Sequence, residues 1–323
     1  MTMQRLEWID RMRGLAILSV VVQHLTTSFS NEFVYHKIIG ISNMGLFFFI
    51  SGYLMVITSK WSGFKDSMNF IIKKIRTLIF PLISWGILLP AFVFQNNWHT
   101  VSWESFVSEW KDPHLWFLLT LFGYSILFAI HRFVKVRLRC YNVMYGGALL
   151  VVFQIALLLI WKMSGDFKLA TLYWIYFASG IIIAECKWER FLENKYLLSG
   201  SFVILLLVVC FWTSGATSVK NIAVKIICTY SIILLVYNIS KNMQFYRYID
   251  KFFQLCGRES IAIYAVHWLF LKMVIAPVLL PQNELIGLGI TSVFAVLVSI
   301  ICIYIHRLIK MLPIVKLILF GEK

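Results

Sequence analysis

Hydrophobic positions along this chain gather into ten long runs that are separated by short polar stretches. Each run approaches the roughly 20 residues that an α-helix needs to cross about 30 Å of hydrocarbon. The pattern predicts an all-α fold, a polytopic integral membrane helical bundle of about ten transmembrane helices. The runs fall near 12–29, 39–58, 77–95, 115–134, 143–161, 168–185, 197–213, 221–239, 259–280 and 285–306.

The third run carries two prolines, Pro81 and Pro90. Proline removes a backbone donor and its ring clashes with the preceding turn, so we expect a kink in this helix. Neighbouring helices must then satisfy the freed carbonyl groups.

Composition supports the membrane interpretation. Of the 323 residues, 60% are hydrophobic and 14% are charged, whereas a soluble domain is about a quarter charged. The gaps between runs are too short to bury an independent core. We therefore expect one transmembrane domain over 1–323 with no appended soluble domain, and a first run that is retained as a span.

Charge indicates the orientation. The formal net charge is +15, but it is unevenly distributed. If the N-terminus is cytoplasmic, 23 of the 30 Lys and Arg residues fall in inside segments, six fall outside, and Lys272 lies within the ninth run. This bias follows the positive-inside rule. It predicts that both termini are cytoplasmic, and it explains the basic charge without a nucleic-acid partner.

The six cysteines predict neither a disulfide framework nor a metal site. Cys140, Cys186 and Cys256 fall in predicted cytoplasmic segments, which are reducing. The other three lie in apolar runs, and no CxxC pair or His/Cys cluster occurs. We expect packing roles for all six and no bound metal.

The first run contains two ionisable residues, Arg13 and His24. Eleven helical steps give about 16 Å of rise and return to within about 20° of the same face. One interpretation is a long ligand along the helix, with its charged end at Arg13 and its reactive end at His24. A pantetheine arm has a comparable length. The alternative is a positive-inside anchor and a histidine that hydrogen-bonds another helix.

A basic cluster precedes the third run in "FIIKKIRTLIFP", with Lys73, Lys74 and Arg76. Lys73 and Arg76 are three positions apart, which places them on one face of an α-helix. Together with Arg13 they predict a pocket for phosphate groups. The alternative is a topology anchor.

The ninth run opens with "GRESIAIYAVHWLF", in which Ser260, Tyr264 and His267 share one helical face. A polar face inside a membrane meets protein or a water-filled cavity. This pattern is typical of a binding site or of interhelical hydrogen bonding.

The predicted external stretch 96–114 and the residues after it are rich in tryptophan, carboxylates and histidine, including His114 and Trp116. Aromatic rings with acidic groups between them suit sugar rings and hydroxyls. The alternative is an aromatic belt at the membrane interface.

Five segments resemble membrane-bound acyltransferase family 3, whose bacterial members modify surface sugars. "IDRMRGLAILSVVVQH" resembles its arginine and histidine separated by ten residues, and the other four follow in the family's order along almost the whole chain. They are "NMGLFFFISGYL", "KKIRTLIFP", "HLWFLLTL" and "GRESIAIYAVH". Lys73 departs from the family, which usually has arginine there, and loses bidentate phosphate geometry.

The resemblance implies an O-acyltransferase in the bacterial cytoplasmic (inner) membrane. Its donor would be acetyl-CoA, and its acceptor a hydroxyl of a surface polysaccharide or a lipid-linked precursor. By resemblance, His24 and Arg13 would be catalytic. The residues that would bind the donor are Arg13 again, Lys73, Lys74 and Arg76. The residues that would bind the acceptor are Trp116, His114, Ser51, Tyr264 and His267.

Ser51 and Gly52 are small, so they predict a close helix approach beside the first span.

The rival function is a transporter or flippase of a polar solute, which would also need polar residues within the membrane. An inverted repeat would favour it, and the sequence shows none.

Overall fold

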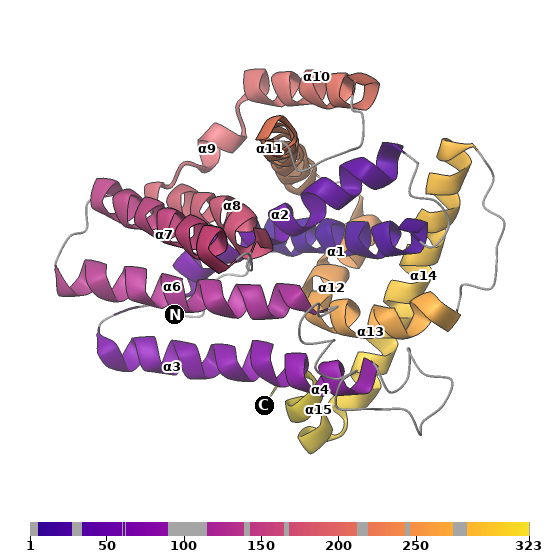
Figure 1. Ribbon diagram of the computed structural model, residues 1–323. Helices are drawn as coiled ribbons and strands as arrows, with labels where there is room; N and C mark the ends of the chain where they lie inside the picture. The colour runs from indigo at the N-terminus through magenta and orange to yellow at the C-terminus, as the bar shows by residue number, and fades with distance from the viewer. Residues whose placement is uncertain are drawn as a thin grey trace. The chain divides into compact units, whose positions relative to one another are not determined.

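The computed structural model describes residues 6–27, 34–59, 61, 63–89, 115–138, 143–164, 168–211, 219–242, 246–273 and 283–322. Every regular element in these ranges is helical, which confirms the predicted all-α fold. Figure 1 shows the helices coloured in chain order. The chain divides into two compact units: unit 1 is Met1–Ile50 and Trp188–His306, and unit 2 is Ser51–Lys187 and Arg307–Lys323.

Unit 1 is built around its first helix. Met12, Ile17 and Val20 are fully buried, and α1 contacts α11, α12 and α13. The helices that lie wholly or mainly in unit 1 are α1 (Glu7–Thr27), α2 (Val34–Thr58, of which residues up to 50 belong here), α9 (Glu189–Leu192), α10 (Lys195–Phe211), α11 (Val219–Asn242), α12 (Arg247–Arg258), α13 (Ser260–Met273) and α14 (Glu284–Lys310).

Unit 2 has an aromatic core between α6 and α8. The ring of Tyr124 lies 5.1 Å from that of Trp174 and 5.0 Å from that of Phe177, and all three are buried. Figure 1 shows α3, α6, α7 and α8 running along one another. Besides the end of α2, the helices of unit 2 are α3 (Phe64–Lys74), the π-helix η1 (Ile75–Ile79), α4 (Phe80–Leu89), α6 (Trp116–Arg137), α7 (Val143–Ser164), α8 (Lys168–Cys186) and α15 (Pro313–Phe320).

Four of the described helices are long and apolar enough to cross a membrane, judged by length and composition alone. They are Trp116–Arg137, Met144–Met163, Ile222–Asn242 and Glu284–Lys310. Shorter apolar helices match further predicted runs at Ser42–Thr58, Thr171–Cys186, Lys195–Val208 and Ser260–Phe270. A total of about ten spans stays a prediction.

The surface of α14 is typical of a helix in lipid. Val293 and Tyr304 are exposed, whereas Thr291, Ser299 and His306 are buried. Water would favour the opposite arrangement, because large exposed apolar surfaces are costly there. The polar groups point inward because hydrocarbon offers them no partner.

Two helices lie in stretches between the predicted apolar runs. α3 begins at residue 64, well before the predicted third run, and α12 occupies much of 240–258. α12 is amphipathic: Cys256 and Gly257 are buried, whereas 88% of the surface of Tyr248 is exposed. A twelve-residue amphipathic helix contains no long apolar run, so hydrophobicity alone does not predict it.

The kink expected in the third run takes the form of a π-helical turn. The backbone N–H of Phe80 donates to the carbonyl of Ile75, five residues earlier. Pro81 follows directly, and in a regular α-helix its ring would clash with the carbonyl of Thr77. The widened turn accommodates the proline while the helix continues into α4.

Two helices of unit 1, α1 and α12, cross with their backbones in close contact. A β-carbon on Gly14 would overlap the carbonyl oxygen of Phe253, and one on Gly257 would overlap the carbonyl oxygen of Asp10. Each helix therefore presents a glycine to the backbone of the other. Small residues allow such approach, and packing is a main force between helices in lipid.

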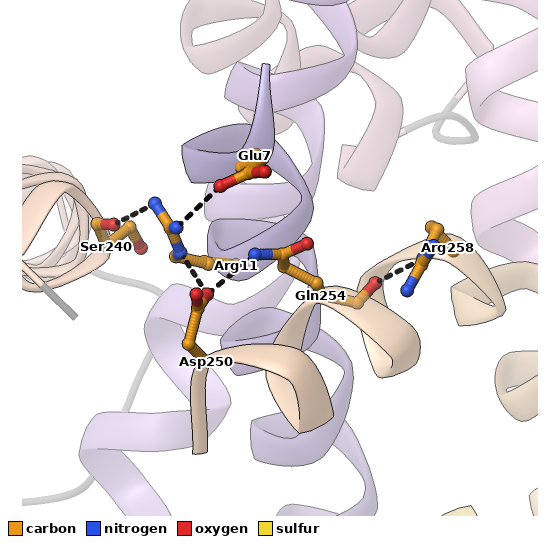
Figure 2. Close-up of polar contacts among 6 residues, drawn as sticks. All are labelled: Glu7, Arg11, Ser240, Asp250, Gln254 and Arg258. Atoms are coloured by element: carbon orange, nitrogen blue, oxygen red, sulfur yellow. Dashed lines mark hydrogen bonds and ion pairs between the residues drawn. The ribbon is translucent and has the colours of Figure 1, made fainter. Parts of the chain in front are cut away.

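Arg11 joins three helices beside this crossing, as Figure 2 shows. Its Nε donates to Asp250 Oδ1 of α12 at 2.5 Å, and its Nη1 donates to the carbonyl of Ser240 of α11 at 3.2 Å. Nη2 donates to Glu7 within α1, and Gln254 also donates to Asp250. Arg11 is one of the 23 Lys and Arg residues in the predicted inside segments, and the structure shows it as a buried cation with structural partners.

Replacing Gly257 by alanine should destabilise the protein. The new methyl group overlaps backbone, which cannot rotate away as a side chain can, and overpacking typically costs about 1–3 kcal/mol. Thermal unfolding in detergent would measure the loss. Gly289→Ala is the matched control, because its β-carbon would meet no atom within 4 Å. Equal melting temperatures for Gly257→Ala and the parent would contradict the close crossing.

The ion pair of Arg11 and Asp250 should make stability depend on pH. The hydrogen bond from Arg11 lowers the pKa of Asp250. The pair therefore stabilises the fold above the unfolded-state pKa of about 4 and loses this effect as pH falls through the folded-state pKa. Asp250→Asn should cost about 1.5–3 kcal/mol at pH 7.

The difference between parent and Asp250→Asn should shrink below about pH 4, since the parent then loses the same charge. Chemical unfolding at several pH values would test this. A difference that stays constant down to pH 2 would show that the charge of Asp250 does not stabilise α12.

Candidate functional site

Arg13 and His24 lie on one continuous helix, as predicted, because α1 runs unbroken from Glu7 to Thr27. Arg13 lies beside the α1–α12 crossing, next to Gly14. Its Nη2 donates to the hydroxyl of Ser260 at 2.7 Å. Ser260 is buried and begins α13. The first and the last of the polar segments in the sequence thus meet at this contact.

His24 lies in a cluster of three rings. Its ring centre is 5.4 Å from that of His267 and 4.5 Å from that of Trp268, and the latter two are 5.3 Å apart. The two imidazoles come from α1 and α13, residues far apart in the chain. Trp268 contacts His24 more closely than His267 does, and it holds the imidazole by ring packing.

A backbone hydrogen bond fixes the tautomer of His267. Its Nδ1 lies 2.9 Å from the carbonyl oxygen of Ile263. A carbonyl only accepts, so Nδ1 carries the proton and Nε2 of the neutral ring is an acceptor. Tyr264 is buried and its ring lies 6.1 Å from that of His267.

The two polar contacts show that α1 and α13 run in the same direction. Arg13 meets the start of α13, and His24 meets residues 267 and 268 further along it. The rise is about 16 Å in α1 and about 10 Å in α13. The long Arg13 side chain spans the difference. Both side chains face α13, as expected for two positions on one helical face.

The basic cluster of unit 2 is less uniform than predicted. Lys73 is exposed at the end of α3, whereas Lys74 lies over the ring of Phe70 at 5.3 Å. Arg76 lies in η1, and its Nε donates to the carbonyl of Gly321 at 2.9 Å. Lys73 lies in the last turn of α3, whereas Arg76 lies in the π-helix that begins directly after it, so the two do not belong to one regular α-helix. Their common pocket with Arg13, a residue of unit 1, stays a prediction.

The residues predicted for the acceptor have different outcomes. Trp116 begins α6, half-buried, with its ring 5.5 Å from that of Tyr173. His114 and the stretch 96–114 lie outside the described residues. Ser51 is half-buried in α2. A close approach occurs at Gly52, toward the carbonyl of Phe177 in α8. The approach expected beside the first span, which lies in unit 1, stays a prediction.

A buried charged cluster in unit 2 was missed by sequence reasoning. Glu185 of α8 accepts from Lys135 at 2.8 Å and from Arg132 at 3.3 Å, both in α6. Only 8% of the Glu185 side chain is exposed. Lys135 and Arg132 had been interpreted as orientation signals. An acidic residue at the end of an apolar run is the signal that points to this pair.

Gly146 of α7 completes this cluster. A β-carbon there would lie 3.1 Å from Lys135 Nζ, 3.3 Å from His131 Nε2 and 3.4 Å from Glu185 Oε2. Three polar atoms therefore converge on one glycine, and α7 approaches closely because it has no side chain there. No group of three His, Cys, Asp or Glu side chains in the described part of the chain is arranged to hold a metal.

Comparison with known proteins identifies the family. The family model described as "Acyltransferase domain", that of acyltransferase family 3, matches residues 6–305, nearly the whole chain. No curated protein and no solved structure matches. The matched region includes both helices of the Arg13–Ser260 and His24–His267 contacts and the basic cluster of unit 2. With its apolar helices, this chain is a membrane protein that belongs to acyltransferase family 3.

Proposed function

We propose that the protein is an O-acyltransferase of the bacterial cytoplasmic (inner) membrane. It moves an acetyl group from acetyl-CoA to a hydroxyl of a surface polysaccharide or its lipid-linked precursor. The observation that supports this most is the contact between α1 and α13. The guanidinium of Arg13 lies at one end of this contact, and the imidazoles of His24 and His267 lie at the other. Family membership favours acyl transfer over transport.

The proposed reaction forms a C–O bond between the acceptor hydroxyl and the acetyl carbon and breaks the C–S bond of the thioester. The hydroxyl proton passes to the departing thiolate. His24 suits this transfer because imidazole titrates near neutral pH. A second route forms a transient acyl-imidazole on His24 before the hydroxyl attacks. Trapping of a labelled acyl-enzyme would distinguish the two routes.

His267 and Trp268 are proposed to position His24. The proton on His267 Nδ1 is held by the Ile263 carbonyl, so this ring offers only Nε2 as an acceptor. The packing of Trp268 at 4.5 Å limits rotation of His24. Fixed orientation favours proton transfer, because displacement of a catalytic group by about 1 Å can cost about 100-fold in rate.

Arg13 is proposed to bind a phosphate group of the donor. Guanidinium groups make charge-assisted, often bidentate contacts to phosphate. Its bond to Ser260 orients the side chain. The same proposal assigns Lys73, Lys74 and Arg76 to donor phosphates. The acceptor is assigned to Tyr264 and His267, with Ser51, Trp116 and His114 as further contacts.

Replacing His24 by alanine should reduce transfer by at least about 100-fold, the usual contribution of a general base or acid. Purified protein would be supplied with labelled acetyl-CoA and a candidate glycan. Ser19→Ala is the matched control on the same helix, since its hydroxyl bonds only to the carbonyl of Ala16 within α1. Full transfer by His24→Ala would remove this residue from the mechanism.

The proposed orientation is tested separately from chemistry. The loop charges favour cytoplasmic termini and put the tryptophan-rich stretch 96–114 outside. Single cysteines introduced near residue 105 should react with an impermeant reagent added to intact cells, whereas one near the N-terminus should not. The reverse labelling pattern would refute the orientation and the acceptor side together.

A further inference from the structure

The short helix α15 ends against η1 and α4, all within unit 2. Two of its last carbonyl groups, and that of Gly321 directly after it, accept hydrogen bonds from these elements. Arg76 Nε donates to Gly321 at 2.9 Å, Ser84 Oγ donates to Ile318 at 2.7 Å, and Trp85 Nε1 donates to Leu319 at 3.0 Å. The last carbonyls of a helix lack partners within it and carry partial negative charge. The donors of η1 and α4 thus cap α15.

The contact is reciprocal at Gly321. This residue has a φ of 64°, in the left-handed region that favours glycine, and a β-carbon would overlap the carbonyl oxygen of Arg76. The ring of Phe320 is buried 5.8 Å from that of Trp85. Each side of the contact therefore restrains the other, and Arg76 is the residue that they share.

The contact leaves part of the Arg76 guanidinium available. Nε is occupied by the Gly321 carbonyl, and the Arg76 side chain makes no other hydrogen bond or ion pair with the described residues. Nη1 and Nη2 remain, and these two groups form a fork that matches two oxygens of a phosphate. An arginine held at Nε loses less freedom when it binds, so its affinity for an anion is higher.

We propose that α15 is the positioning element of the donor site: it holds Arg76 so that its Nη fork receives a phosphate group of a nucleotide thioester. The proposal rests on the proposed function, in which Arg76 binds the donor. α15 lies beyond residue 305, where the family match ends. The proposal therefore gives this chain a determinant of donor affinity outside the matched domain.

Calorimetry with coenzyme A in detergent would test it with two variants. Gly321→Ala forces the contact apart, and Trp85→Phe removes one cap while keeping the ring. Both should bind coenzyme A about two- to tenfold more weakly, the effect of releasing one immobilised side chain. Glu322→Gln is the control, because its pair with Lys310 is exposed and spans 3.5 Å. It should bind like the parent.

A double-mutant cycle separates positioning from general damage. In an Arg76→Ala background, Gly321→Ala and Trp85→Phe should have no further effect on coenzyme A affinity. An equal loss with and without Arg76 would overturn the positioning role. So would normal binding by folded Trp85→Phe and Gly321→Ala proteins when Arg76→Ala binds weakly.

Different results would contradict the proposed function. If Arg76→Ala binds coenzyme A like the parent, the donor assignment of Arg76 is wrong, and the positioning proposal falls with it. If the parent binds coenzyme A and the variants weaken binding as expected, but the parent transfers no acetyl group, the acetyl or glycan assignment fails while the positioning of Arg76 stands. The two results come from separate measurements.

Discussion

The close crossing of α1 and α12 is the constraint on which the rest of unit 1 depends: Gly14 meets the backbone of Phe253, and Gly257 meets the backbone of Asp10. Lipid gives helices no hydrophobic reason to associate, so fit and polar contacts must hold them. Here each helix offers a glycine to the other, and Arg11 adds a buried ion pair beside them. Because α12 leads directly into α13, this crossing also determines where Ser260 lies, and hence where the guanidinium of Arg13 is held.

The same contacts explain how polar groups are tolerated within an apolar protein. Arg13 and His24 are half-buried, and both meet a second polar helix that begins at the crossing. Polar and aromatic partners replace water for the guanidinium and the imidazole, which reduces the cost of placing them there. A closely packed helix crossing beside Arg13 is therefore followed by an aromatic and imidazole cluster further along α1.

Sequence reasoning worked where the signal is local. The helical fold and the common face of Arg13 and His24 follow from periodicity within one segment. It did not predict that Ser260 is the partner of Arg13, because 247 residues separate them and no local pattern encodes that contact. The burial of Glu185 was missed for a related reason, because its partners lie on a second helix. The kink at η1 follows from Pro81 in the same run, but the sequence does not specify its π-helical form.

The buried Glu185 cluster has a consequence for how the protein enters the membrane. Lys135 precedes its partner by 50 residues. At a synthesis rate of about 5–20 residues per second, α8 follows α6 by about 3–10 s. During this interval the cations at the end of α6 lack the carboxylate, and unpaired cations resist transfer into lipid. When α8 arrives, Glu185 pairs with both cations and offsets one of their two charges, so the ion pairs that join α6 to α8 form only after α6 has been made.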